Sequence, residues 1–152
     1  MPYGPESFSQ TFDPLQFFQL PTLGSGAVID LTGRLVRRCI IETRGEPSPE
    51  FGALHFDERY IYDDGTPDDV MHWAVNRVGE RLEAHEPSVE GAVASTLDGV
   101  RWRVVFRRME PAALTFDVTF IQVAPDTVIK LVKLKRFGLT LARLHGFHRQ
   151  RL

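Results

Sequence analysis

The stretch FDERYIYDDGTPDDVMHWAV, residues 56–75, holds two aromatic-rich runs joined by a short acidic segment. Side chains alternate between the two faces of a β-strand. One face of the first run therefore carries three rings and one acid, at Phe56, Glu58, Tyr60 and Tyr62. The Asp64-Gly65 pair favours a tight hairpin turn, because such turns need residues that tolerate positive φ. The stretch thus predicts two antiparallel strands with a glutamate on an aromatic face.

Runs of this kind recur along the chain and are separated by turns that contain glycine or proline. They cover residues 26–31, 34–44, 53–63, 70–78, 81–86, 89–97, 101–108, 114–123, 127–137 and 139–150. After Leu20, apolar residues do not recur with the 3.6-residue period of a helix. About ten strands joined by tight turns predict an antiparallel meander, and such a sheet resolves its open edges by closing into a barrel. The expected fold class is therefore all-β, with a single barrel.

The start of the chain has a different pattern. Residues 12–18, FDPLQFF, predict a short helical turn whose rings pack on or into one end of the barrel. We expect one domain over residues 1–152, because a chain of this length buries one substantial core. Residues 1–23 would form the lead and plug, and residues 24–150 the barrel.

Several predicted strands have one aromatic face and one charged face. The aromatic faces should be internal, because burying one large ring contributes roughly 1.5–3 kcal/mol. The rings on these faces beyond the first run are Trp102, Phe106, Phe116 and Phe120. The same parity places Glu58 inside, where a carboxylate needs an ionic or hydrogen-bonding partner. A tyrosine hydroxyl, His72 or a lysine could serve, and either Lys133 or Lys135 could reach inward, since neither face of residues 127–137 is purely apolar.

Composition excludes several classes of function. The net charge of -2 and the pI near 6.2 give no broad electrostatic footprint for nucleic acid. The single cysteine, Cys39, excludes an internal disulfide and is expected to be a buried, inert thiol. No apolar run approaches the ~18 residues that a membrane helix needs. The first residues show neither the basic nor the apolar region of an export signal, so we expect a cytoplasmic protein.

No metal or cofactor is expected. The acidic segment with Asp63, Asp64, Asp68 and Asp69 lacks the spacing of a calcium loop and predicts a solvated hairpin tip. His145 and His148 would point to opposite faces of a strand, which makes a shared zinc ion improbable.

The order of these motifs resembles a bacterial family of uncharacterised proteins, many of them lipoproteins, that are regarded as lipocalin-like. The segment that carries the resemblance best is the run with Glu58, Tyr62, Asp63, Asp64, Gly65 and Thr66, followed by Trp73. A second segment is Lys135-Arg136-Phe137-Gly138. The resemblance implies a lipocalin-like barrel and supplies no established activity.

The leading functional hypothesis is that the barrel binds or carries a small, mostly apolar or amphipathic molecule, since barrels of this size can enclose one. The expected ligand-binding residues are Phe56, Glu58, Tyr60, Tyr62, His72, Trp102, Phe106, Phe116, Phe120 and Lys135. One alternative is an isomerase- or cyclase-type enzyme that uses Glu58 as acid or base. Another is a solid barrel whose outer face binds a partner protein. The sequence leaves the oligomeric state open.

Overall fold

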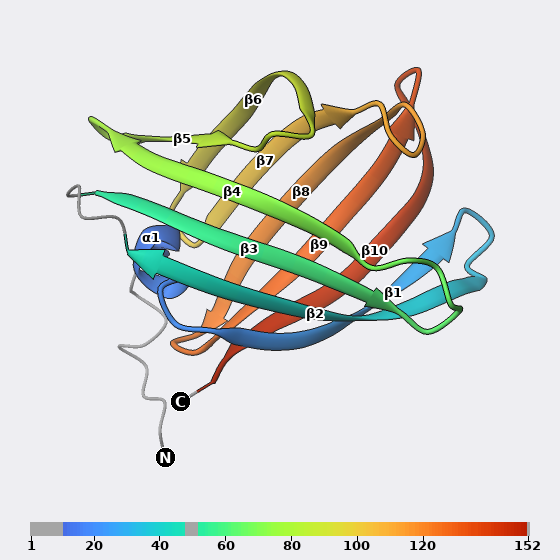
Figure 1. Cartoon of the computed structure of the whole chain (residues 1–152), viewed down its shortest axis with the longest axis horizontal. Coiled ribbons are helices and arrows are strands. Elements are labelled where there is room, and N and C mark those ends of the chain that lie inside the picture. Colours follow the sequence, from blue (N-terminus) through green and yellow to red (C-terminus); the bar gives the residue numbers. More distant parts are fainter. Residues whose placement is uncertain (1–10, 48–51, 152) are drawn as a thin grey trace.

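The computed structural model describes residues 11–47 and 52–151 (Figure 1). Over these residues it contains one short helix, α1, and ten strands that coincide closely with the ten predicted runs. The elements are α1 Pro14–Phe17, β1 Thr22–Asp30, β2 Leu35–Pro47, β3 Ala53–Tyr62, β4 Asp69–Val78, β5 Arg81–His85, β6 Val89–Asp98, β7 Arg101–Arg108, β8 Leu114–Ala124, β9 Thr127–Arg136 and β10 Leu139–Gln150. The predicted all-β fold class is confirmed.

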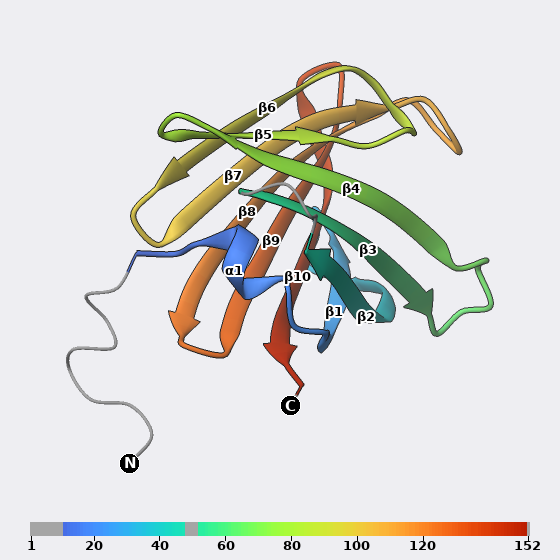
Figure 2. The same cartoon turned by 60° about the vertical axis from the view of Figure 1, so that its left-hand side comes forward.

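All ten strands belong to one antiparallel sheet, in the order β5-β4-β3-β2-β1-β10-β9-β8-β7-β6. Every neighbouring pair is consecutive in the chain except β1 and β10, which join the first strand to the last. The two ends of the sheet, β5 and β6, are themselves consecutive and lie side by side (Figures 1 and 2). The sheet therefore curls into a nearly closed barrel, and its seam runs between β5 and β6.

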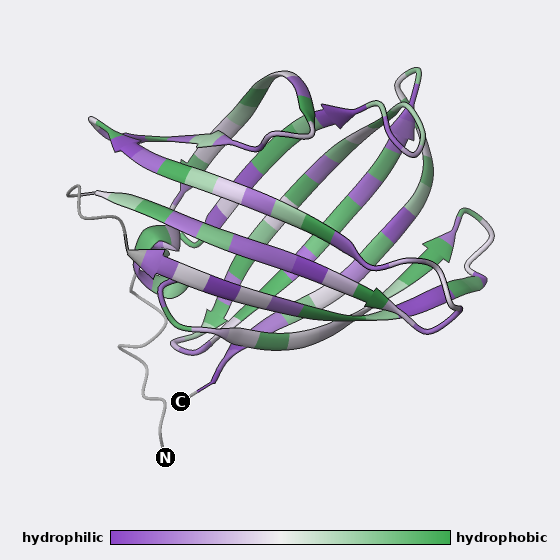
Figure 3. Ribbon diagram, in the orientation of Figure 1, coloured by the Kyte–Doolittle hydropathy of each residue, from purple (hydrophilic) through white to green (hydrophobic). Residues whose placement is uncertain are grey.

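Alternating burial follows the predicted parity. Along β3 the residues change strictly between buried and exposed from Leu54 to Tyr60. Figure 3 shows the same alternation as bands of hydrophobic and hydrophilic residues along most strands. At the predicted Asp64-Gly65 turn, and at the Asp98-Gly99 turn between β6 and β7, both glycines adopt positive φ, +80° and +59°, which residues with a Cβ rarely tolerate.

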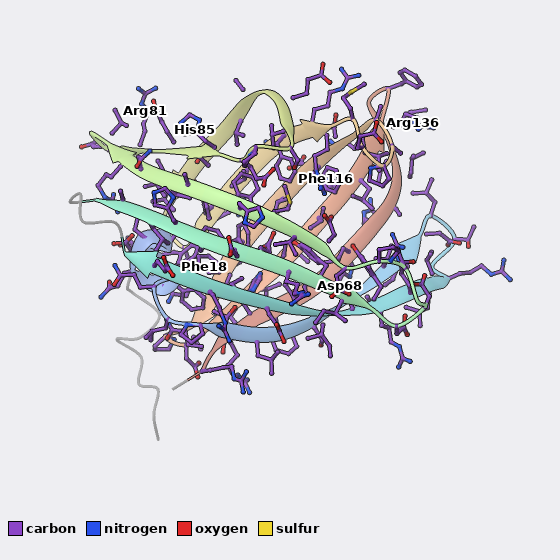
Figure 4. All side chains as sticks on the ribbon, viewed as in Figure 1. Phe18, Asp68, Arg81, His85, Phe116 and Arg136 are labelled. Atoms are coloured by element: carbon purple, nitrogen blue, oxygen red, sulfur yellow. The ribbon has the colours of Figure 1, made fainter. Side chains whose placement is uncertain are left out.

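The N-terminal segment plugs one end of the barrel, as expected. Asp13 caps α1 by accepting a hydrogen bond from the backbone N–H of Leu15 at 3.1 Å. Phe18, which is fully buried, stacks on Phe56 with ring centroids 4.9 Å apart. On β2, Gly45 allows this close packing, because a Cβ there would lie 1.8 Å from the backbone oxygen of Phe18. Figures 2 and 4 show α1 and Phe18 at the same end of the barrel.

Side chains reinforce the seam where the sheet ends. Arg108 on β7 donates two hydrogen bonds to Asp69 on β4, at 2.7 and 3.0 Å, and a third to the hydroxyl of Ser88 at 3.1 Å. Ser88 in turn hydrogen-bonds Glu86, whose carboxylate also accepts the backbone N–H of His72 at 2.7 Å. Arg108 and Glu86 are both buried. We call these five residues the seam network, because their hydrogen bonds join β4 to β7 across the seam.

Three further expectations are resolved by the fold. Cys39 is free and buried, and burial raises the pKa of its thiol. His148 is buried while His145 is exposed, so the two histidines do lie on opposite faces. No helix in the described ranges is long and apolar enough to cross a bilayer. Residues 1–10, on which the expectation about an export signal depends, lie outside the described residues.

Candidate functional site

The interior of the barrel holds a cavity of about 380 Å³. This volume falls within the range of pockets that enclose small molecules. Its lining extends from the middle of the barrel to residues 66–69 and to Pro111 and Leu114, so the mouth lies at the end opposite α1. In Figure 4, Asp68 and Phe116 lie toward this end and Phe18 toward the plugged end. The cavity is therefore closed on one side by the plug and reached from the other.

Aromatic side chains form most of the wall. Eight rings line the cavity, at Phe56, Tyr60, Tyr62, Trp73, Trp102, Phe106, Phe116 and Phe120. Seven of them belong to the set expected from the sequence, and Trp73 is the addition. Trp73 packs edge-on against Phe106 across the seam, with ring centroids 5.1 Å apart. The structure thus brings the predicted rings together, while their role in binding a ligand stays a prediction.

A belt of aliphatic residues completes the wall. Its members face one another in register on β7, β8, β9, β10 and β1, in the order Val104, Val118, Val132, Leu144 and Val28. All five are buried and all five line the cavity. The belt therefore lines the middle of the cavity with apolar side chains, and the larger aromatic rings border it.

An ion pair forms the floor of the cavity. Lys130 Nζ lies 2.6 Å from Glu58 Oε2 and also donates a hydrogen bond to the hydroxyl of Tyr60. The side chains of Glu58 and Lys130 are only 3 % and 2 % exposed. The ammonium also lies over the rings of Tyr60 and Phe120, at 4.7 and 5.2 Å from their centroids. The inward carboxylate therefore has the cationic partner that its burial requires, and Tyr60 accepts a hydrogen bond from the same cation.

The two charges come from opposite walls of the barrel. Glu58 belongs to β3 and Lys130 to β9, and three strands separate them in the sheet. Beside Lys130, the positions in register on β10 and β1 are Gly146 and Gly26. These residues carry no side chain that would stand between the lysine and the far wall. The lysine can therefore extend across the interior to Glu58.

A second polar layer lies beneath the floor. The imidazole of His148 is fully buried, and its Nδ1 lies 3.3 Å from the hydroxyl of Thr22, which in turn hydrogen-bonds Thr43 at 2.6 Å. Burial, and then the nearby charge of Lys130, hold the pKa of His148 well below its usual value. The imidazole is thus neutral near pH 7, and the 3.9 Å between its Nε2 and Glu58 Oε2 is a contact rather than an ion pair.

The mouth is polar and its charges are paired. Arg37 lies over the ring of Tyr62 at 4.2 Å and donates a hydrogen bond to Thr66 at 3.2 Å. Burial raises the pKa of Tyr62 to about 12, so its hydroxyl stays protonated near pH 7. The Nε of Arg37 is buried and has no hydrogen-bond partner among the described residues.

The expected role of His72 in the cavity is wrong. Its side chain is 62 % exposed on the outer face of β4, where Nδ1 lies 2.7 Å from Asp57. The physical reason is parity: Met71 and Trp73 point inward, so the residue between them must point outward.

Lys135 also lies outside the cavity, contrary to expectation. It approaches Asp117 on the outer face, with Nζ 3.4 Å from Oδ2, and Arg103 makes two shorter hydrogen bonds to the same carboxylate. Arg103 and Lys135 hold the pKa of Asp117 below its usual value. Lys133 is exposed on the same face, so neither of the two lysines considered from the sequence reaches inward.

The acidic segment is an exposed hairpin tip, as predicted, and each of its acids contacts an arginine. The pairs are Asp63 with Arg38, Asp64 with Arg37, Asp68 with Arg59 and Asp69 with Arg108, at 2.8, 3.9, 3.2 and 2.7 Å. Among the described residues, no group of histidines, cysteines and acids has the arrangement of a metal site.

Two charged residues of the candidate site were not predicted from the sequence. Lys130 shares its face of β9 with Val128 and Val132, both of which are buried. These apolar neighbours were the signal that Lys130 points inward. Arg108 follows Phe106 by two residues and therefore continues the inward face of β7. Alternation thus assigns Arg108 to the interior, whereas the face of Lys130 also carries Arg136, so alternation alone left the position of Lys130 open.

Residues 5–150 match the family model described as "Protein of unknown function (DUF3833)". The chain belongs to the DUF3833 family. No curated protein matches this DUF3833 member. The family match agrees with the resemblance to an uncharacterised family, whereas the lipocalin-like character of the barrel stays a prediction.

Proposed function

We propose that this DUF3833 protein binds a small, mostly apolar molecule inside its barrel. The observation that carries the proposal is the cavity of about 380 Å³, walled by eight rings and an aliphatic belt and reached from one end. Apolar cavities with a few placed polar groups are typical of small-molecule sites. Burial of a ligand against this wall would supply the binding free energy, at roughly 25 cal/mol per Å² of apolar surface.

The hollow interior favours carriage over a solid barrel that only binds partner proteins. A barrel whose sole role was rigidity would gain stability by filling the space, since empty volume costs contacts. Here large rings line the space without closing it.

The floor favours binding over acid–base catalysis. Glu58 is held by Lys130 and is deeply buried, so the pair is arranged as a fixed polar platform. A general acid or base must exchange a proton with its substrate, whereas the carboxylate of Glu58 is already engaged by the ammonium of Lys130 at 2.6 Å.

The test is a titration with N-phenyl-1-naphthylamine, an uncharged dye whose fluorescence rises in apolar surroundings. We expect saturable binding of one dye molecule per chain. The matched variant is Val118→Phe, which adds a ring to the middle of the aliphatic belt and fills part of the cavity. Loss of dye binding in this variant, with an intact far-UV spectrum, supports the proposal. Equal binding by both proteins, or no saturable binding to the wild type, refutes it.

A further inference from the structure

We infer that the ligand is uncharged and that it carries a hydroxyl or carbonyl group which hydrogen-bonds the Glu58–Lys130–Tyr60 floor. This inference rests on the proposed function and specifies its ligand class. The molecule would lie along the barrel axis, with its apolar body inside the ring-lined wall and its polar end on the ion pair.

The charge balance of the lining is the first argument. Three cations and three anions line the cavity, at Arg37, Arg108, Lys130, Glu58, Asp68 and Asp69. Each already lies within 4 Å of an opposite charge, either another member of the set or an outer residue. No charge is left over to balance a carboxylate, phosphate or ammonium group on a ligand.

The position of the floor is the second argument. Glu58 and Lys130 are about 97 % buried, and the wall above them is apolar. A charged head group placed there would lose its hydration and would meet one like charge together with one opposite charge that is already engaged. A sterol-like or alcohol-like head group would bring no charge into this environment.

The hydrogen-bonding capacity of the floor is the third argument. An ammonium has three N–H donors, and the bonds to Glu58 and Tyr60 account for two of those on Lys130. Burial raises the pKa of Tyr60 well above its usual value, and the charge of Glu58 raises it further, so its hydroxyl keeps its proton. The floor can thus donate to a carbonyl and can also accept from a hydroxyl through the carboxylate.

The experiment compares three ligands of equal chain length that differ only in the head group: nonanol, nonanoate and nonylamine. Each ligand is titrated at neutral pH into the wild-type protein loaded with N-phenyl-1-naphthylamine, and the loss of dye fluorescence is measured. We expect nonanol to compete at least about ten-fold more strongly than either charged ligand, because only the charged head groups lose strong hydration without compensation.

Two variants link this selectivity to the floor. Glu58→Gln leaves Lys130 as an unbalanced cation, so we expect the affinity ratio of nonanoate to nonanol to rise by about ten-fold. Asp57→Asn is the matched control, because Asp57 is the neighbouring acid on the opposite, outer face and its side chain is 61 % exposed. It should leave the ratio unchanged.

The outcomes separate the two levels of the proposal. Displacement by nonanol far ahead of both charged ligands supports the inference. Displacement by nonanoate or nonylamine at similar or lower concentration overturns it and leaves the binding function standing. Failure of the dye itself to bind overturns both. If Glu58→Gln does not fold, the three wild-type titrations decide alone.

Discussion

Removing the lysine of the floor should destabilise the protein strongly. In Lys130→Met the carboxylate of Glu58, whose side chain is 3 % exposed, loses its ionic partner and stays buried. Breaking a buried pair in this way costs about 3–5 kcal/mol of unfolding free energy. For a chain of about this size, each 1 kcal/mol shifts the melting temperature by about 2–4 °C, so the expected fall is roughly 6–20 °C.

Urea unfolding followed by tryptophan fluorescence measures this loss, because Trp73 and Trp102 both lie in the barrel interior. The double variant Glu58→Gln with Lys130→Met should recover at least about half of the loss, since it leaves no lone charge inside. The control is Lys133→Met, an exposed lysine on the same strand, which should change the unfolding free energy by less than about 0.5 kcal/mol. A Lys130→Met protein as stable as the wild type, or a double variant less stable than the single one, would refute the cross-barrel pair.

Three further predictions concern the seam, the buried histidine and the plug. Arg108→Met should lower the unfolding free energy by about 2–4 kcal/mol, because the seam network loses a cation that makes three hydrogen bonds. Urea titration measures this loss, and an unchanged unfolding midpoint would contradict the prediction. In the unfolded chain His148 binds a proton near pH 6.5, whereas in the folded chain its pKa lies well below that value. The unfolding free energy is therefore highest above pH 6.5, and it should fall by up to about 1.4 kcal/mol per pH unit as the pH drops toward 5. His148→Gln should remove this slope and His145→Gln, on the outer face, should keep it, as pH-dependent urea titrations will show. Phe18→Ala should cost about 3–5 kcal/mol, since this ring is fully buried between others; thermal melting that stays at the wild-type temperature would exclude its role in the plug.

Alternation predicted much of this molecule, because strand parity is a local property. Glu58 points inward for the same reason that Phe56 and Tyr60 do, and each can be assigned within one strand. The hairpin turns follow from Asp-Gly pairs in the same local way. The plug was predictable too, since its phenylalanines had no other core to enter.

The partner of Glu58 could not be assigned locally. Lys130 comes from β9, which three strands separate from β3 in the sheet, and the two side chains meet only because the barrel curls. In residues 127–137 lysines and aliphatic residues occur on both faces, so parity alone did not decide which lysine is internal. The seam network depends in the same way on closure, since Asp69 and Arg108 belong to the two halves of the sheet that meet there.

A crystal structure of the protein with nonanol tests most directly whether the barrel holds an uncharged amphipathic ligand on its buried ion pair. We predict density for one nonanol molecule in the cavity, with its oxygen within hydrogen-bonding distance of Lys130 Nζ, Tyr60 Oη or a carboxylate oxygen of Glu58. A cavity that stays empty or filled with ordered water at saturating nonanol would contradict the proposed function. An oxygen that points to the mouth instead would contradict the assigned ligand class.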